Sequence, residues 1–211
     1  MAPKNKFTRD QMIDAALRVV RNRGYAALTA QSMAEQLGTS TRPIFTCFET
    51  MEKVRREVRL AAERCYRGYE AQGLQETIAF LGYGRAYIRF AKEEPELYRL
   101  LFLSAEGNAV SKMRSSRAYV LPLLMRIYGL SEREAERYFR DTWLTVHSLG
   151  TLIVNGGCPY TDAEIERILT GASLAFCKAV KEIPGFATDA YDRDAVFRAL
   201  TGKESPEAGN A

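Results

Sequence analysis

The stretch that most constrains the fold is residues 29–48, TAQSMAEQLGTSTRPIFTCF, which predicts two short helices joined by a sharp turn. Thr29 can cap the first helix through its hydroxyl, and Gly38 follows that helix as a left-handed stop. The second helix begins near Thr41, and the small Ala34 lets the two helices cross at close range. The pattern favours a DNA-binding helix-turn-helix over an ordinary helical hairpin, because helices this short bury little surface on their own.

Further features stand in a fixed order around this stretch. They are, in chain order, a Gly-aromatic corner at Gly24-Tyr25, a helix capped by Thr29 and an LG-x-S turn at Leu37-Gly38-Thr39-Ser40. An aromatic-x-x-Phe helix end follows at Phe45-Thr46-Cys47-Phe48, and a Thr-x-Glu helix start at Thr50-Met51-Glu52. In this order they resemble the N-terminal domain of the TetR family of transcriptional regulators. The resemblance is close over residues 8–58 and extends beyond them only in helical layout and length.

The resemblance implies an all-α protein with two domains. Residues 1–50 would form an N-terminal three-helix helix-turn-helix DNA-binding domain, from which a long connector helix runs to about residue 70. Residues 51–211 would form a C-terminal helical bundle that binds a ligand and dimerises. The sequence departs from the family pattern at two places. Met51 stands where the family has a lysine that touches a DNA phosphate, so the resemblance does not carry that contact over to this chain. Arg42-Pro43 stand where the family has small residues, which predicts an unusual base preference.

Composition and charge agree with a protein that faces nucleic acid at one end. The chain of 211 residues is 46% hydrophobic and 27% charged, as is typical of a globular protein with a buried core. Its longest apolar run, 143–154, is too short to span a bilayer, and the basic N-terminus leads into no apolar signal segment, so we expect a cytoplasmic protein with no membrane partner. Residues 1–70 carry thirteen Lys and Arg against eight Asp and Glu, which suits a phosphate-facing first third.

The sequence contains no pattern typical of catalysis or metal binding. Its four cysteines form no CxxC pair and have no neighbouring histidine, so we expect neither zinc nor disulfides: Cys47, Cys65, Cys158 and Cys177. The chain has one histidine, no Gly-rich phosphate loop and no nucleophile elbow. We therefore expect no catalytic residue, no metal and no cofactor, and an enzyme is the least favoured class.

Caps and breaks predict the remaining helices. Capping boxes at Thr8, Ser131 and Thr161 mark three helix starts, and Gln72-Gly73 ends the connector helix. We expect helices at 74–92, 96–103, 119–129, 131–154, 161–180 and 191–200. Residues 104–116 lack a clean period and are predicted to be a loop, and Pro122 is expected to kink the following helix or to start it.

Eleven residues are predicted to contact DNA: Lys4, Lys6, Thr29, Gln31, Ser40, Thr41, Arg42, Pro43, Phe45, Thr46 and Lys53. The N-terminal arm, Thr29, Thr46 and Lys53 would position the domain on phosphates, whereas Gln31 and residues 40–43 would face base edges. The alternative for the arm is a tail without contacts. Arg42 is the main candidate for base reading, because a guanidinium can donate two parallel hydrogen bonds to guanine O6 and N7. Phe45 and Phe48 are expected mainly in the core, although the family resemblance implies that Phe45 also reaches the DNA backbone.

Aromatic residues in the second domain predict a ligand pocket, with a solid core as the alternative. The predicted lining residues are Tyr83, Tyr87, Phe90, Tyr98, Phe102, Met113, Tyr119, Leu123, Trp143 and His147. Trp143 and His147 are four residues apart on one helix face, and with Gly150 they resemble a motif in one branch of TetR-family C-terminal domains. Such a lining favours a lipophilic or planar effector, and nearby arginines could equally serve an acid: Arg85, Arg89 and Arg99.

The last two long helices are predicted to form the dimer interface. Their short connection makes them antiparallel, so they could pack against the same pair of a second chain as a four-helix bundle. The predicted interface residues are Ile165, Ile168, Leu169, Ala172, Phe176 and Val180, and the alternative is that these helices only close the core. The resulting hypothesis is a homodimeric repressor that a small-molecule effector releases from a pseudo-palindromic operator in double-stranded DNA. The other hypothesis is a partner-regulated or architectural DNA-binding protein without a small-molecule effector.

Overall fold

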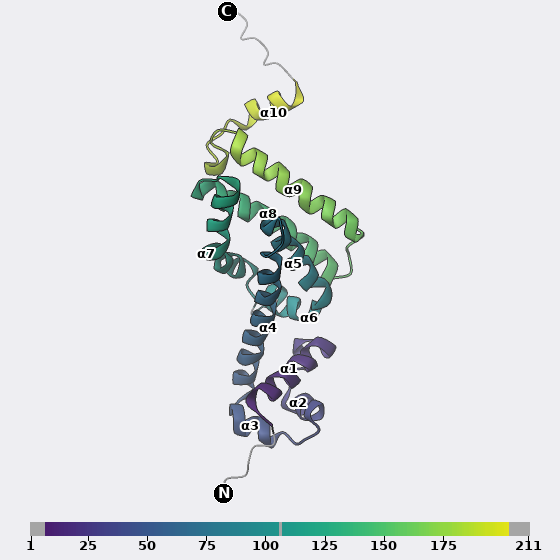
Figure 1. The fold of residues 1–211 in the computed structure, drawn as a ribbon. Helices are drawn as coiled ribbons and strands as arrows, with labels where there is room; N and C mark the ends of the chain where they lie inside the picture. The colour runs from purple at the N-terminus through teal and green to yellow at the C-terminus, as the bar shows by residue number, and fades with distance from the viewer. Residues whose placement is uncertain (1–6, 106, 203–211) are drawn as a thin grey trace, which may run out of the picture.

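The computed structural model describes residues 7–105 and 107–202, and all regular secondary structure in this part of the chain is helical (Figure 1). The all-α class is therefore confirmed. No helix among the described residues is long and apolar enough to cross a membrane. Lys4 and Lys6, which were predicted to contact DNA, lie outside the described residues.

The first three helices form a small bundle at one end of the molecule (Figure 1). α1 (Arg9–Arg23) begins with the predicted capping box, in which the Gln11 N–H donates to Thr8 Oγ1 at 3.2 Å and the Thr8 N–H donates to Gln11 Oε1 at 2.8 Å. A 3-10 turn, η1 (Tyr25–Ala27), leads to α2 (Ala30–Leu37) and α3 (Arg42–Phe48). Fully buried apolar side chains from these segments hold the bundle together: Val20, Leu28, Met33 and Ile44.

A single long helix, α4 (Met51–Gly73), starts beside α3 and continues into the C-terminal body (Figure 1). The predicted break at Gln72-Gly73 is confirmed, since α4 ends there. A β-carbon on Gly73 would lie 2.3 Å from the carbonyl oxygen of Gly82 in α5 (Ala79–Glu93), so the backbones approach too closely for any side chain. The close approach of α4 and α5 therefore depends on glycine at both Gly73 and Gly82.

The C-terminal body is arranged around α8 (Glu132–Val154), which packs against α5, α7 (Ala109–Tyr128) and α9 (Asp162–Glu182). The predicted capping boxes at Ser131 and Thr161 are confirmed at the starts of α8 and α9. Between α5 and α7 lie α6 (Pro95–Tyr98) and a five-residue π-helix, η2 (Arg99–Leu103). After α9, η3 (Phe186–Thr188) leads to α10 (Arg193–Thr201), which lies at the opposite end from the first three helices (Figure 1).

Two predicted boundaries are wrong. The helix predicted from residue 74 begins only at Ala79. The loop predicted at residues 104–116 is helical from Ala109, because the Asn108 side chain accepts a hydrogen bond from the Ser111 N–H at 2.9 Å and so caps α7. Pro122 lies inside α7 and does not start it.

An ion pair beside Cys65 of α4 links α1 to the C-terminal body. The Arg21 guanidinium of α1 donates to both carboxylate oxygens of Glu94, at 2.7 and 2.8 Å. Glu94 immediately precedes α6, which packs against α1. The first helix therefore contacts the C-terminal body directly.

Candidate DNA-binding interface

Local hydrogen bonds fix where α2 begins. The Ser32 N–H donates to Thr29 Oγ1 at 3.1 Å, and the Thr29 N–H donates to Ser32 Oγ at 3.0 Å. The predicted Thr29 cap is thus confirmed, with a reciprocal partner in Ser32 that the sequence pattern did not single out. The Ser32 hydroxyl also donates to the Ala27 carbonyl at 2.8 Å, which joins the start of α2 to the preceding turn. A cap of this kind stabilises a helix by about 1 kcal/mol.

The turn between α2 and α3 has the geometry that the sequence predicted. Gly38 adopts the left-handed conformation, with φ of 62°, in which only glycine is free of strain. The Thr39 N–H donates to the Ala34 carbonyl at 3.0 Å, which closes the end of α2. Ala34 is 5% exposed and Ile44 is fully buried, so the two helices meet through small and apolar side chains. This packing orients α3 relative to α2.

α3 exposes its polar residues and buries two apolar ones. Ile44 and Phe48 point into the core, whereas Phe45 is 43% exposed. The expectation that Phe45 lies mainly in the core is therefore wrong, and its ring is available for a partner. Arg42 is exposed, and its guanidinium makes no hydrogen bond or ion pair with any described residue. Thr46 is exposed, and its hydroxyl donates to the Arg42 carbonyl at 2.9 Å.

The other predicted contacts lie on or beside the same two helices. Thr29, Gln31 and Ser40 are exposed, and Thr41 and Pro43 are partly buried. The Thr41 hydroxyl makes no cap bond to α3, so it is free of that role.

Lys53 differs from the prediction in one respect. Its ammonium already donates to Glu49 at 2.6 Å, and this bond lowers the pKa of the Glu49 carboxyl. A phosphate would therefore have to replace Glu49 as the partner of Lys53. Met51, at the position of the family's lysine, packs against the core.

Two arginines near the start of α4 were not among the predicted contacts. Arg55 and Arg56 are exposed and have no ion pair within the described part of the chain. Arg9 is less available, because it pairs with Glu57 at 2.9 Å and lies over the Phe48 ring at 4.6 Å. The excess of Lys and Arg in residues 1–70 already indicated a basic surface in this part of the chain. Composition alone does not show which of these arginines lack an ion pair.

The aromatic residues predicted to line a ligand pocket instead pack against one another. Most of them belong to the apolar core and are 4% exposed or less: Tyr83, Tyr87, Phe90, Tyr98, Phe102 and Trp143. The His147 ring stacks on Trp143 with ring centroids 4.8 Å apart, and its Nδ1 lies 2.8 Å from Tyr87 Oη and 3.1 Å from Tyr98 Oη. Burial lowers the pKa of His147 and so favours the neutral ring, whose tautomer decides whether Nδ1 accepts from or donates to these hydroxyls.

Gly150 explains the rest of the Trp-x-x-x-His-x-x-Gly pattern. A β-carbon at Gly150 would lie 2.8 Å from Tyr98 Oη and 3.1 Å from the Tyr87 ring. The glycine therefore lets both tyrosines approach α8 closely enough to reach His147. An effector could enter this cluster only if the rings moved apart.

The remaining predicted pocket residues lie on α7, away from this cluster. The Tyr119 side chain is 42% exposed, and its hydroxyl donates to the Glu70 carboxylate at 2.7 Å. Glu70 is only 4% exposed and also accepts hydrogen bonds from Tyr83 at 3.0 Å and Ser116 at 3.1 Å, which ties α4 to α5 and α7. Met113 lines a separate cavity, and Leu123 is half-buried.

The predicted dimer residues on α9 mostly serve the core of their own chain. Three of them are 4% exposed, namely Ile165, Leu169 and Val180, and three are partly buried, namely Ile168, Ala172 and Phe176. This face of α9 is occupied because α9 must cover α5 and α8. Apolar side chains on the opposite face are free: Leu174 is 67% exposed, and on α8 Leu144 and Leu152 are 47% and 41% exposed. A partner chain would meet this outer face.

Residues 80–172 match the family model of the tetracyclin repressor-like C-terminal domain. No curated protein matches the chain. The matched residues are separate from residues 8–58, on which the resemblance of the N-terminal part rests. The match therefore confirms the resemblance to TetR-family regulators from a second part of the chain.

Proposed function

We propose that this chain, a TetR-family transcriptional regulator by its C-terminal domain, is a homodimeric repressor that a small-molecule effector releases from a pseudo-palindromic operator in double-stranded DNA. In this proposal residues 1–50 read DNA and residues 51–211 dimerise and bind the effector. The protein would act in the cytoplasm and carry no enzymatic activity.

The observation that carries the DNA-binding proposal is the unpaired guanidinium of Arg42 on an exposed α3. The capped α2 and the left-handed turn at Gly38 hold α3 in a fixed orientation. The exposed polar residues at the start of α3 and of the preceding turn, chiefly Ser40 and Arg42, would then enter a major groove. Arg42 would read a guanine, while Thr29, Thr46 and Lys53 would hold phosphates.

The outer face of α8 and α9 supports dimerisation. Leu144, Ser148 and Leu152 follow one another at intervals of four residues and are exposed on α8. On α9, Leu174 is exposed, and a β-carbon at Gly171 would meet nothing within 4 Å, so this face is open and allows close approach. Two such faces would pack as a four-helix bundle, and the two-fold axis would place the recognition helices for half-sites roughly 34 Å apart.

The release step rests on the contacts between the two domains. α4 and the pair Arg21 with Glu94 connect the DNA-binding helices to α6. An effector that favours a different position of α6 or α4 would change the separation of the two recognition helices, and the dimer would no longer span neighbouring major grooves.

The test is selection of bound sequences from a random pool of double-stranded DNA at physiological salt, because phosphate attraction alone resembles binding at low salt. We expect an enriched inverted repeat with half-site centres about one helical turn apart, or a multiple of it. The selection should be repeated with Arg42→Ala. No enriched sequence, or binding that disappears as salt rises, would contradict specific recognition.

A partner-regulated or architectural DNA-binding protein is the second candidate. The observation in its favour is the dense packing of the aromatic cluster around His147. A thermal-shift screen with small molecules separates the two candidates, since a compound that binds the native state raises the melting temperature.

A further inference from the structure

A cavity lined by arginines lies between α7, α8 and η3. It has a volume of about 420 Å³, which falls within the range of roughly 300 to 1,000 Å³ of small-molecule sites. Five arginines line it, namely Arg114, Arg117, Arg133, Arg137 and Arg140. Met113 and Phe139 add apolar surface. The cavity is thus separate from the aromatic cluster that the sequence suggested.

Positive charge in this cavity exceeds the negative charge available to balance it. Glu136 and Asp189 are the carboxylates that line it, and Asp141, which is not a lining residue, pairs with Arg137. Arg117 pairs with Glu136, and Arg140 pairs with Asp141 at 2.8 Å. Arg114 and Arg133 have no ion pair among the described residues. Two unpaired guanidinium groups therefore face one open cavity, where they attract anions.

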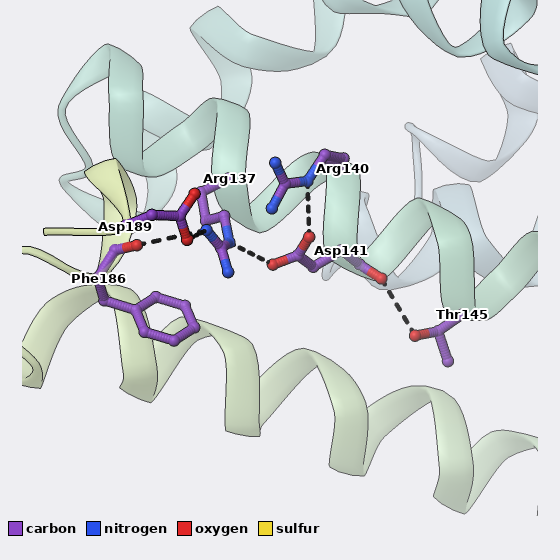
Figure 2. A network of polar contacts seen from close by, with 6 residues as sticks. All are labelled: Arg137, Arg140, Asp141, Thr145, Phe186 and Asp189. Atoms are coloured by element: carbon purple, nitrogen blue, oxygen red, sulfur yellow. Dashed lines mark hydrogen bonds and ion pairs between the residues drawn. The ribbon is translucent and has the colours of Figure 1, made fainter. Parts of the chain in front are cut away.

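Arg137 is the least exposed of the guanidinium groups, with 14% of its side chain accessible. Figure 2 shows its polar contacts with Asp141 and Asp189. Its Nε donates to Asp141 at 2.6 Å, and its guanidinium lies 4.6 Å from the centre of the Phe186 ring. Nη1 pairs with Asp189 and lies 3.5 Å from the Phe186 carbonyl oxygen. Asp141 and Phe186 thus hold the guanidinium in a fixed orientation toward the cavity.

Asp189 differs from the other carboxylate partner of Arg137. Its side chain is 69% exposed, whereas that of Asp141 is 16% exposed. Asp189 ends η3 in a left-handed conformation with φ of 56°, which is unfavourable for most residues other than glycine, asparagine and aspartate. Arg137 lowers the pKa of the Asp189 carboxyl, so the group is ionised at neutral pH. An exposed carboxylate on a short turn is the partner that another oxyanion can replace.

We propose that this cavity binds a small anion with two or more carboxylate or phosphate groups. One oxyanion replaces Asp189 on Arg137, and the second lies between Arg114 and Arg133. Where the ligand has a carbon skeleton, Met113 contacts it. Guanidinium groups suit such ligands because they donate parallel hydrogen bonds to carboxylate and phosphate oxygens.

The position of the cavity connects it to the DNA-binding domain. α7 carries three residues that bond to α4: Lys112 pairs with Glu63, and Ser116 and Tyr119 donate to Glu70. An anion that draws Arg114 of α7 toward Arg137 of α8 would shift α7 and, with it, α4. The role of the anion as effector rests on the proposed repressor function, whereas its binding does not.

Binding is measured by calorimetry on the full chain without DNA, so the result is independent of operator recognition. Citrate and pyrophosphate are the probes, and acetate at equal ionic strength is the control. We expect saturable binding of citrate or pyrophosphate, and the tighter of the two identifies the carboxylate or phosphate class. We expect the double variant R114Q/R133Q, which removes no ion pair among residues 7–105 and 107–202, to weaken binding by about tenfold or more.

Two further variants separate a built site from general attraction between charges. Arg126→Gln removes an exposed arginine of α7 that does not line the cavity and should leave binding within about twofold. Asp189→Asn removes the carboxylate that competes with the ligand for Arg137, so it should tighten binding. Damage to the fold would instead weaken binding. Acetate binding as tight as citrate and pyrophosphate, equal losses in R114Q/R133Q and Arg126→Gln, or weaker binding in Asp189→Asn would each overturn the proposal.

Discussion

Replacing Arg42 by alanine tests whether α3 reads bases. The Arg42 side chain is exposed, and its guanidinium bonds to no described residue, so the variant removes no contact that holds the chain folded. We expect its melting temperature to equal that of the parent within about a degree. Any loss of DNA affinity then reports the contact with DNA and not a change in stability.

The magnitude follows from the number of contacts. A bidentate pair between arginine and guanine contributes about 1 to 3 kcal/mol of discrimination, and a dimer presents two such arginines. The dissociation constant for the operator should therefore rise by roughly 30-fold to 20,000-fold. Binding to unrelated DNA should change much less, because base contacts contribute little to it.

Fluorescence anisotropy with the selected operator, and with operators altered at each position, measures this effect. Arg42→Ala should no longer distinguish the four bases at one position per half-site. Arg126→Ala, which removes an exposed arginine of α7, is the matched control. An equal loss on every sequence, with a salt dependence lower by about one phosphate per half-site, would show that Arg42 holds a phosphate and would refute the base-reading argument.

Three further predictions concern the C-terminal domain. Gly150→Ala places a β-carbon 2.8 Å from Tyr98 Oη and should lower the free energy of unfolding in urea by about 1 to 3 kcal/mol, whereas Gly68→Ala, in open space, should raise it by roughly 0.5 to 1 kcal/mol. Leu174→Glu should shift the dimer toward monomer in analytical ultracentrifugation, whereas Leu200→Glu, 76% exposed on α10, should not; equal effects would contradict the proposed interface. Burial lowers the pKa of His147 below 6.5, so the unfolded chain binds this proton first, and stability should fall as pH drops below that value. His147→Gln should remove this part of the pH dependence, and an unchanged stability profile would refute it.

Local sequence patterns predicted four capped helix starts and the stop at Gly38. The caps at Thr8, Thr29, Ser131 and Thr161 and the stop at Gly38 were predictable because each depends on residues within a few positions of one another. α7 was partly missed for a physical reason. It buries only four residues, and none of them lies in its first turns after the cap at Asn108, so no helical spacing of apolar residues marks its start.

Features that depend on tertiary packing could not be predicted from the sequence. The predicted apolar stripe of α9 is present in the structure. A stripe in the sequence does not indicate whether it packs against its own chain or against a partner chain. Arg137 and Asp189 are fifty-two residues apart, so no local pattern connects them. The bond between Lys53 and Glu49 spans only four residues and was predictable, since oppositely charged groups at this spacing often pair.

The ion pair of Arg21 with Glu94 gives a last prediction, on the coupling between the domains. Glu94→Gln preserves the shape of the side chain but removes the charge that binds Arg21, and because Arg21 is 38% exposed the loss of stability should be no more than about 1 kcal/mol. The DNA-binding helices would then be held to α6 less firmly, so the separation of the two recognition helices would vary more. We expect weaker binding to the operator with little change for unrelated DNA, whereas Glu93→Gln, which alters the neighbouring contact with Tyr69, should leave both unchanged. If operator affinity is the same in Glu94→Gln and in the parent, the ion pair between Arg21 and Glu94 does not set the spacing of the recognition helices.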